Sequence, residues 1–206
     1  MEVTETKTGT TSAKASDGKS WLFRFLVIVA VGIMLVSWFM PWWTIDIEGF
    51  ATDAAQIRPW GLELCDQIGG FAILLKGTEM PSWFGAFMWV YLSLCMLAIL
   101  VGLFVPEKKF SFGKIKFTLS QFLIGGVGFS YVFAGIVAAV YAGIRMKSTF
   151  NVPLQGRAFI DMGDPLIAYA DTRLLPGYYL IYVAGLSLLA LALLRNKITG
   201  AENPGA

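Results

Sequence analysis

Long apolar stretches alternate with shorter polar ones along the chain, and the apolar stretches predict four membrane-spanning helices. They cover about residues 21–43, 84–105, 118–144 and 177–194. Each is long enough to cross about 30 Å of hydrocarbon at about 1.5 Å per residue. None carries a charge near its middle, unlike most helices of soluble proteins. The pattern therefore predicts an all-α integral membrane protein, with four helices in an antiparallel bundle.

The segments between the expected helices differ in length and polarity. Residues 106–117 form a short, lysine-rich inner loop, whereas residues 44–83 and 145–176 are too long for turns and too apolar for disordered linkers. The stretch TIDIEGF at 44–50 alternates apolar and polar residues, as a half-buried strand does. FAILLKG at 71–77 fits a short strand or an interfacial helix. We expect the two long outer loops to form a small mixed cap over one end of the bundle.

Charge at the helix ends predicts the orientation. Residues 1–20 and 195–206 are polar and are expected to be a disordered and a flexible tail, respectively. The side with both tails and the inner loop holds ten basic residues, against six on the side of the long loops. Lysine and arginine are enriched in cytoplasmic segments. We therefore expect a multi-pass protein of the cell membrane with both termini in the cytoplasm, and an outer side that holds nine of the fourteen acidic residues.

Aromatic residues gather where the expected helices meet the long loops. Indole and phenol rings favour the membrane boundary, because their bodies are apolar and their polar atoms need a wet partner. Pro41 is expected to end the first helix at the same level. The expected membrane-interface anchors are Trp38, Trp42, Trp43, Trp83, Tyr178 and Tyr179.

Small residues recur every four positions in the third apolar stretch. Such rows let helix backbones approach closely, so that van der Waals contacts hold helices together in lipid. The contact can lie inside the bundle or with another subunit. The expected helix-packing residues are Ser130, Ala134, Gly135, Ala138, Ala139, Ala142 and Gly143.

Residues that carry common enzyme chemistry are scarce. The chain has no histidine, the commonest general base near neutral pH. Cys65 and Cys95 are expected at different depths, so they give neither a disulfide nor a zinc site. Pairs such as Asp161 and Asp164 supply too few oxygen atoms for a calcium site. With a net charge of +2 and no phosphate-binding or hydrolase motif, we expect no catalysis, cofactor, metal or nucleic acid.

One stretch and the layout resemble the claudin and peripheral-myelin group, four-helix membrane proteins with a long first outer loop. In that group the loop carries Trp, then Gly-Leu-Trp, then two cysteines. Here WGLELC gives Trp60, Gly61, Leu62 and Cys65. The Trp after Gly-Leu is missing, Cys65 comes one residue early, and no second outer cysteine exists to complete the disulfide. The resemblance implies a role in adhesion or at junctions.

Three functions fit these patterns. The spans hold no ionisable residue at depth, which argues against ion-coupled transport and favours a non-catalytic membrane subunit that packs with and stabilises a larger complex. An oligomeric pore or a carrier of small molecules or lipids is one alternative, and an adhesion or junction protein of claudin-like layout is another. The expected partners are the lipid bilayer and other membrane subunits or further copies of the chain. The polar face of the pore would comprise Ser120, Gln121, Ser130, Tyr131 and Tyr141.

Overall fold

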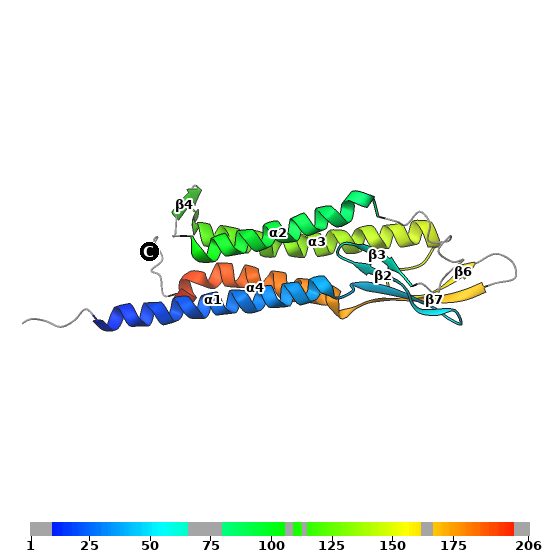
Figure 1. Cartoon of the computed structure of the whole chain (residues 1–206), viewed down its shortest axis with the longest axis horizontal. Helices are drawn as coiled ribbons and strands as arrows, with labels where there is room; N and C mark the ends of the chain where they lie inside the picture. The colour runs from blue at the N-terminus through cyan, green and yellow to red at the C-terminus, as the bar shows by residue number, and fades with distance from the viewer. Residues whose placement is uncertain (1–9, 66–79, 106–108, 113–114, 162–166, 200–206) are drawn as a thin grey trace, which may run out of the picture.

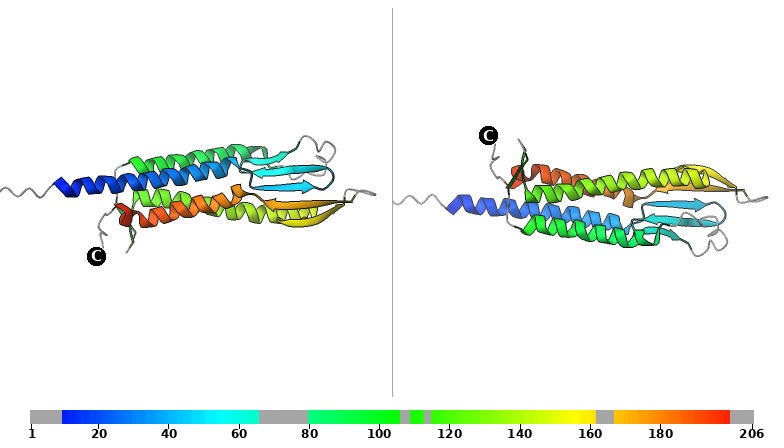
Figure 2. Two further views of the ribbon diagram at one scale, coloured as in Figure 1. Left: turned by 90° about the horizontal axis from the view of Figure 1, so that it is seen from below. Right: turned by 90° about the horizontal axis from the view of Figure 1, so that it is seen from above.

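A bundle of four helices runs along the long axis of the molecule, with a β-sheet beyond one end (Figures 1 and 2). This is a computed structural model, which describes residues 10–65, 80–105, 109–112, 115–161 and 167–199. We call the end with the large sheet the sheet end, and the opposite end, where α1 begins and α4 ends, the hairpin end. The helices are α1 Thr10–Phe39, α2 Ser82–Phe104, α3 Leu119–Phe150 and α4 Pro176–Thr199.

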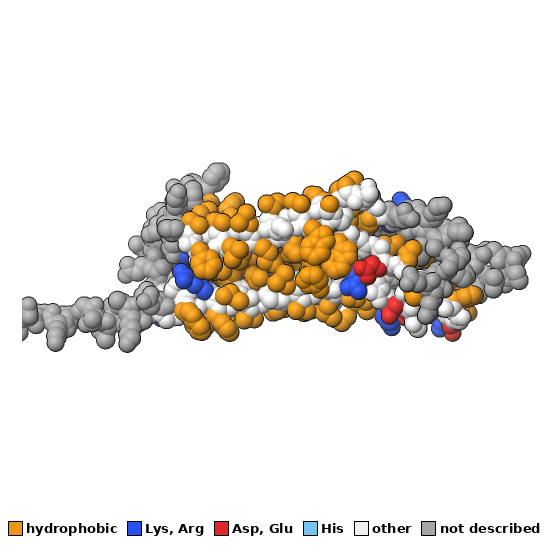
Figure 3. Space-filling model, in the orientation of Figure 1, with side chains coloured by type: hydrophobic (Ala, Val, Ile, Leu, Met, Phe, Trp, Pro, Cys, Tyr) orange, Lys and Arg blue, Asp and Glu red, His pale blue; other side chains and the backbone are white. Residues whose placement is uncertain are grey.

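Each helix contains a segment that is long and apolar enough to cross a membrane. These segments are Gly18–Phe39, Ser82–Phe104, Leu119–Ser148 and Pro176–Thr199. Apolar side chains cover the visible face of the bundle between basic side chains at the hairpin end and mixed charges at the sheet end (Figure 3). The structure thus has the form of a multi-pass membrane protein, as the apolar pattern predicted.

Two separate segments of the chain build one five-stranded antiparallel sheet. The segment between α1 and α2 contributes β1, β2 and β3, and the segment between α3 and α4 contributes β6 and β7. The strand order is β3-β2-β1-β7-β6, so the β1–β7 pair joins the two segments. The bounds are Trp43–Ile47 for β1, Ala51–Arg58 for β2, Gly61–Leu64 for β3, Gly156–Asp161 for β6 and Ile167–Leu174 for β7.

The all-α class therefore fits only in part. The expected cap is an ordered sheet, and β1 covers most of the stretch at 44–50 whose alternation indicated a strand. The other strands were not predicted, because their apolar positions are short runs broken by turn residues. The stretch at 71–77 lies outside the described residues.

The first and last helices differ from expectation at their ends. α1 ends at Phe39, before Pro41, and the chain re-enters regular structure as a strand at Trp43. It begins at Thr10, so the second half of the tail expected to be disordered is helical. A helix nucleated in the span can extend through residues that contain no proline. α4 continues to Thr199, because Arg195 is buried, bonded to Thr118 just before α3 and placed over the Phe23 ring of α1, instead of belonging to a flexible tail.

Two apolar cores hold the molecule together. The bundle core runs along all four helices and includes the fully buried Met34 and Ile181. The second core lies beneath the sheet, where Ile45 packs with Met146 and Val152. Because Met146 belongs to α3, this helix extends past the other helices and supports the sheet. Burial of apolar area is the main stabilising contribution in the sheet core, at about 25 cal/mol per Å².

A second, two-stranded sheet lies at the hairpin end. It consists of β4 Lys109–Phe112 and β5 Ile115–Thr118, which pair in antiparallel fashion. β5 leads directly into α3. Thr118 caps that helix by accepting a hydrogen bond from the backbone N–H of Gln121, while the Gln121 side chain accepts one from the backbone N–H of Thr118.

Candidate docking surface

The five-stranded sheet has one buried and one exposed face. In β1 the alternate residues Trp43, Ile45 and Ile47 are buried in the core above α3. Thr44 and Asp46 point the other way, as the two-residue period of a strand requires. The exposed face is therefore the one that carries the charged residues.

Ion pairs cross this exposed face from strand to strand. Arg58 on β2 pairs with Glu63 on β3 at 2.6 Å, and Arg173 on β7 pairs with Asp46 on β1 at 3.0 Å. Exposed pairs of this kind contribute only about 0–1 kcal/mol each. They orient the charged groups of the surface more than they stabilise the sheet.

A groove opens on the exposed face where the β1–β2 turn meets β6 and β7. Its volume is about 570 Å³. Arg157 lies in it, paired with Glu48 of the turn, and its guanidinium carbon is 4.3 Å from the centroid of the Tyr169 ring. Phe50 also lines the groove. Next to it, the Phe159 side chain is 62% exposed, and its ring centroid is 4.3 Å from that of Tyr169.

One carboxylate of the groove, Asp171, forms no ion pair with the residues that the structure describes. Asp171 lies directly opposite Asp46 across the β1–β7 pair and opposite Arg157 across the β6–β7 pair. Asp46 pairs with Arg173 and Arg157 pairs with Glu48, whereas Asp171 forms no ion pair with any residue that the structure describes. Like charges opposite each other destabilise a sheet. The groove therefore combines the aromatic rings of Phe50 and Tyr169 with a carboxylate that has no ion-pair partner in the described part of the chain.

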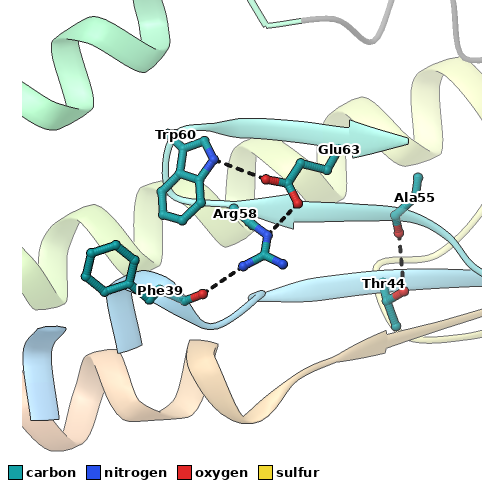
Figure 4. Close-up of polar contacts among 6 residues, drawn as sticks. All are labelled: Phe39, Thr44, Ala55, Arg58, Trp60 and Glu63. Carbon is teal, nitrogen blue, oxygen red and sulfur yellow. Dashed lines mark hydrogen bonds and ion pairs between the residues drawn. The ribbon is translucent and has the colours of Figure 1, made fainter. Parts of the chain in front are cut away.

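A second cluster ties the sheet to the bundle, and Figure 4 shows it. Arg58 donates from Nε to Glu63 and from Nη1 to the backbone carbonyl of Phe39, at the end of α1, at 2.7 Å. Trp60, in the tight turn between β2 and β3, donates its indole N–H to Glu63 at 3.2 Å. Its ring stacks on Trp89 of α2 with centroids 5.6 Å apart. Arg58 and the WGLELC stretch together thus attach the sheet to two helices, Arg58 to α1 and Trp60 to α2.

Four hydroxyl groups inside the bundle bond within the protein, whereas the buried Ser120 hydroxyl has no hydrogen-bond partner among the described residues. Ser37 on α1 donates to the backbone carbonyl of Gly177 on α4 at 2.8 Å, and the Tyr131 hydroxyl lies 3.3 Å from the Ser37 hydroxyl. Tyr91 on α2 and Ser130 on α3 share a hydrogen bond of 3.0 Å. Of the expected polar pore face, Ser130 and Tyr131 therefore serve contacts between helices, whereas Tyr141 is exposed on the bundle surface.

The expected interface anchors divide into two groups. Trp38, Trp42 and Trp43 have exposures of only 0%, 5% and 2%, so the protein covers these indoles instead of lipid. Two of these indoles also donate hydrogen bonds within the protein, Trp42 to the Ser37 carbonyl and Trp43 to the Leu154 carbonyl, whereas the buried Nε1 of Trp38 has no partner among the described residues. The other three, Trp83, Tyr178 and Tyr179, lie at the sheet ends of α2 and α4. Trp83 and Tyr179 are exposed there, and Tyr178 is half-buried.

The small residues expected to pack helices do not all lie at one contact. Gly135 faces α4, where an added Cβ would lie 2.9 Å from Ile181 Cγ2, whereas Ser130 faces Tyr91 of α2. Ala138 packs against the bundle core, and Gly143 lies beside Leu154 near the sheet. The remaining members, Ala134, Ala139 and Ala142, are half-buried.

The closest approach of α3 and α4 involves glycines outside that set. A Cβ on Gly128 would lie 2.7 Å from the backbone oxygen of Gly185. The sequence contains a sign of this contact, since Gly125, Gly126 and Gly128 lie just before the small residues that recur every four positions. The sequence alone does not indicate which of these three glycines faces another helix.

Cys65 and Cys95 are both free thiols. Within the described part of the chain, no group of three or more His, Cys, Asp or Glu residues could hold a metal ion. Comparison with known protein families, with curated proteins and with solved structures gives no match for this chain.

Proposed function

We propose that this chain is a non-catalytic integral membrane subunit that stabilises a larger complex by docking a partner protein at the groove of its five-stranded sheet. The sheet lies outside the cell membrane, and both termini lie in the cytoplasm. The lysine-rich segment at the hairpin end supports this orientation, because basic residues are enriched on the cytoplasmic side. The observation that carries the proposal is the groove, which is lined by the rings of Phe50 and Tyr169 and by Asp171, a carboxylate without an ion pair among the described residues.

The composition of the groove favours a protein partner with a basic side chain. Tyrosine, phenylalanine and arginine are enriched at the centres of protein interfaces, where they contribute most of the binding energy. Phe159 and Tyr169 offer such rings next to Arg157. A lysine or arginine of the partner would balance Asp171, and charge complementarity of this kind gives specificity.

The helix contacts support a subunit role over a pore. A pore needs polar groups that face a shared aqueous path. Here the hydroxyls of Ser130 and Tyr131 bond to other helices of the same chain. Adhesion remains a second candidate, and the specific observation in its favour is that the sheet extends beyond the bundle at one end (Figure 2).

The test is gentle extraction of the native membrane followed by native gel electrophoresis. Wild type should migrate well above a lone 22.6 kDa chain, and Phe159→Ala and Asp171→Asn should release the lone chain. Asp53→Asn is the matched control, because it removes a carboxylate from the same sheet outside the groove. Wild type that migrates as the lone chain, or Asp171→Asn that behaves as Asp53→Asn does, would refute the proposal.

A different assay separates adhesion from subunit assembly. Cells that carry the protein are mixed with cells that lack it, and aggregates of the two kinds are counted. Aggregation that depends on Phe159 and occurs only between cells that both carry the protein would favour adhesion. A complex that assembles within one membrane and leaves the cells dispersed would favour the subunit role.

A further inference from the structure

The five-stranded sheet ends in two edge strands, β3 and β6, and β6 is the longer and more regular of the two. β3 has four residues, and the turn before it packs on α2 through the stacked rings of Trp60 and Trp89. β6 pairs with β7 over six residues in continuous register, without the shift that interrupts the β1–β2 pair. It contains no proline and no lysine, residues that commonly block an edge. β6 is therefore the edge suited to accept another strand.

The register indicates which backbone groups of β6 point away from the sheet. The N–H of Glu48, just after β1, donates to the Tyr169 carbonyl of β7, so the backbone groups of Tyr169 point toward β1. Phe159 lies directly opposite Tyr169 on β6, so its own N–H and C=O point to the outer edge. The groups of Arg157, two residues earlier, point the same way, whereas those of Ala158 point toward β7.

A side-chain contact agrees with this assignment. The Gly156 carbonyl accepts a hydrogen bond from the Thr172 hydroxyl of β7 at 2.9 Å, so Gly156 points inward as Ala158 does. The outward N–H and C=O groups of Arg157 and Phe159 have no hydrogen-bond partner among the residues that the structure describes. A row of backbone groups in this arrangement is a template for one more strand.

This edge is continuous with the groove. Arg157 belongs to both, because its side chain lines the groove while its backbone faces the outer edge. Phe159 lies on the same face of β6 as Arg157, and its side chain is 62% exposed. A strand added to β6 would therefore lie beside the groove, and its side chains on that face would cover Phe159.

The direction of β6 restricts what can pair with it. The strands of the sheet run along the long axis of the molecule, as the helices do (Figure 2). A second copy in the same membrane holds its β6 in the same direction and so cannot add an antiparallel strand. All pairs in this sheet are antiparallel, and such pairs are slightly more stable than parallel ones. The direction therefore favours an extended segment of a different protein.

We propose that the partner protein adds an antiparallel strand to β6 and so reaches the groove. This inference rests on the proposed function, because it states how the partner of the groove is held. Backbone hydrogen bonds to Arg157 and Phe159 supply affinity, and side chains that pack on the Phe159 ring supply specificity.

The first test is amide hydrogen exchange resolved to single residues by mass spectrometry. The complex extracted in mild detergent is compared with full-length wild type expressed alone in a host that lacks the partner. The Arg157 and Phe159 amides should exchange about tenfold more slowly in the complex, because they gain hydrogen bonds. The Ala158 amide, which bonds to β7, should be slow in both samples.

The outcomes of this test separate the added strand from docking itself. Fast exchange of the Arg157 and Phe159 amides within a complex that does form would overturn the added strand and leave the docked partner in place. Slow exchange of both amides in the chain alone would overturn the assignment to a different protein. A wild-type chain that forms no complex would refute the proposed function together with this inference.

The second test removes one outward N–H. Arg157→Pro and Arg157→Ala both delete the side chain, but only proline deletes the N–H, and an edge strand tolerates proline where the ladder does not use that group. Arg157→Pro should weaken the complex about fivefold more than Arg157→Ala in a dilution series on native gels. Slow exchange of the Ala158 and Ala170 amides checks that β6 and β7 remain paired. Equal weakening by the two variants with those amides still slow would overturn the role of the β6 backbone.

Discussion

Gly128 of α3 and Gly185 of α4 bring their helices into backbone contact. A Cβ on Gly128 would lie 2.7 Å from the Gly185 oxygen and 2.9 Å from the Leu189 nitrogen, and one on Gly185 would lie 2.9 Å from the Gly128 oxygen. Real Cβ atoms do not approach backbone atoms so closely, and backbone cannot move aside as a flexible side chain can. In lipid such close packing replaces the hydrophobic driving force between helices.

Gly128→Ala should therefore destabilise the bundle. Overpacking of a tight contact costs about 1–3 kcal/mol, because the added methyl forces α3 and α4 apart. Unfolding in mixed micelles of mild detergent and dodecyl sulfate, followed by circular dichroism, measures the change. Gly126→Ala is the control on the same helix, since no heavy atom lies within 4 Å of its Cβ position. If both variants unfold at the same detergent fraction, the contact does not hold the helices together.

The hydroxyls of Ser37 and Tyr131 should be energetically coupled. Ser37→Ala removes the bond to the Gly177 carbonyl and one partner of Tyr131. Hydrogen bonds between membrane helices contribute about 0.6 kcal/mol on average and up to about 1.7 kcal/mol. Each single variant should be less stable by an amount in this range, and the double variant Ser37→Ala/Tyr131→Phe by less than the sum. Ser93→Ala, which removes only a bond to the carbonyl of Trp89 on the same helix, should have little effect. Full additivity in the double-mutant cycle would argue against the coupling.

The helices could be predicted from the sequence because the bilayer imposes a simple rule. A segment must be apolar over its whole length, and its backbone must be bonded internally. The sheet obeys no such rule. Its strands are short, and one of its central pairs, β1 with β7, joins Asp46 to Asp171, far apart in the chain. Only alternation in β1 gave a local signal.

The docking surface was less predictable still. Glu48 and Arg157 meet only because the two outer segments share a sheet, and nothing in either segment indicates the other. The buried tryptophans illustrate the same limit. Trp42 and Trp43 look like lipid anchors beside an apolar run, yet the chain turns into a strand at that point and covers them. Burial by distant segments cannot be read from local composition.

Arg58 should be needed to hold the sheet against α1. Its Nε and Nη1 atoms bind two different groups, Glu63 and the Phe39 carbonyl. A lysine has a single nitrogen and cannot span both in this geometry. Arg58→Lys should therefore speed amide hydrogen exchange in β2 and β3. Arg157→Lys, at the far edge of the sheet, should leave those amides unchanged. Equal exchange in the two variants would show that the contact to α1 does not anchor the sheet.

Thr118 should be the most sensitive polar position at the hairpin end. Its hydroxyl caps α3 by accepting a hydrogen bond from the Gln121 N–H, and it also accepts one from Arg195, whose exposed fraction is only 7%. Loss of an N-cap side chain costs about 0.5–2 kcal/mol, and loss of a hydrogen bond to a buried charge adds to that cost. Thr118→Ala should therefore lower the free energy of unfolding by more than the cap alone explains. Thr118→Ser keeps the hydroxyl and should remain near wild type in the same detergent titration. Gln121→Ala removes the other half of the capping box and the 3.4 Å bond to Asn196 of α4, and leaves the Arg195 bond in place, so it should cost less than Thr118→Ala. If Thr118→Ala and Gln121→Ala prove equal, the bond to Arg195 contributes no more to the stability of the bundle than the bond between Gln121 and Asn196 does.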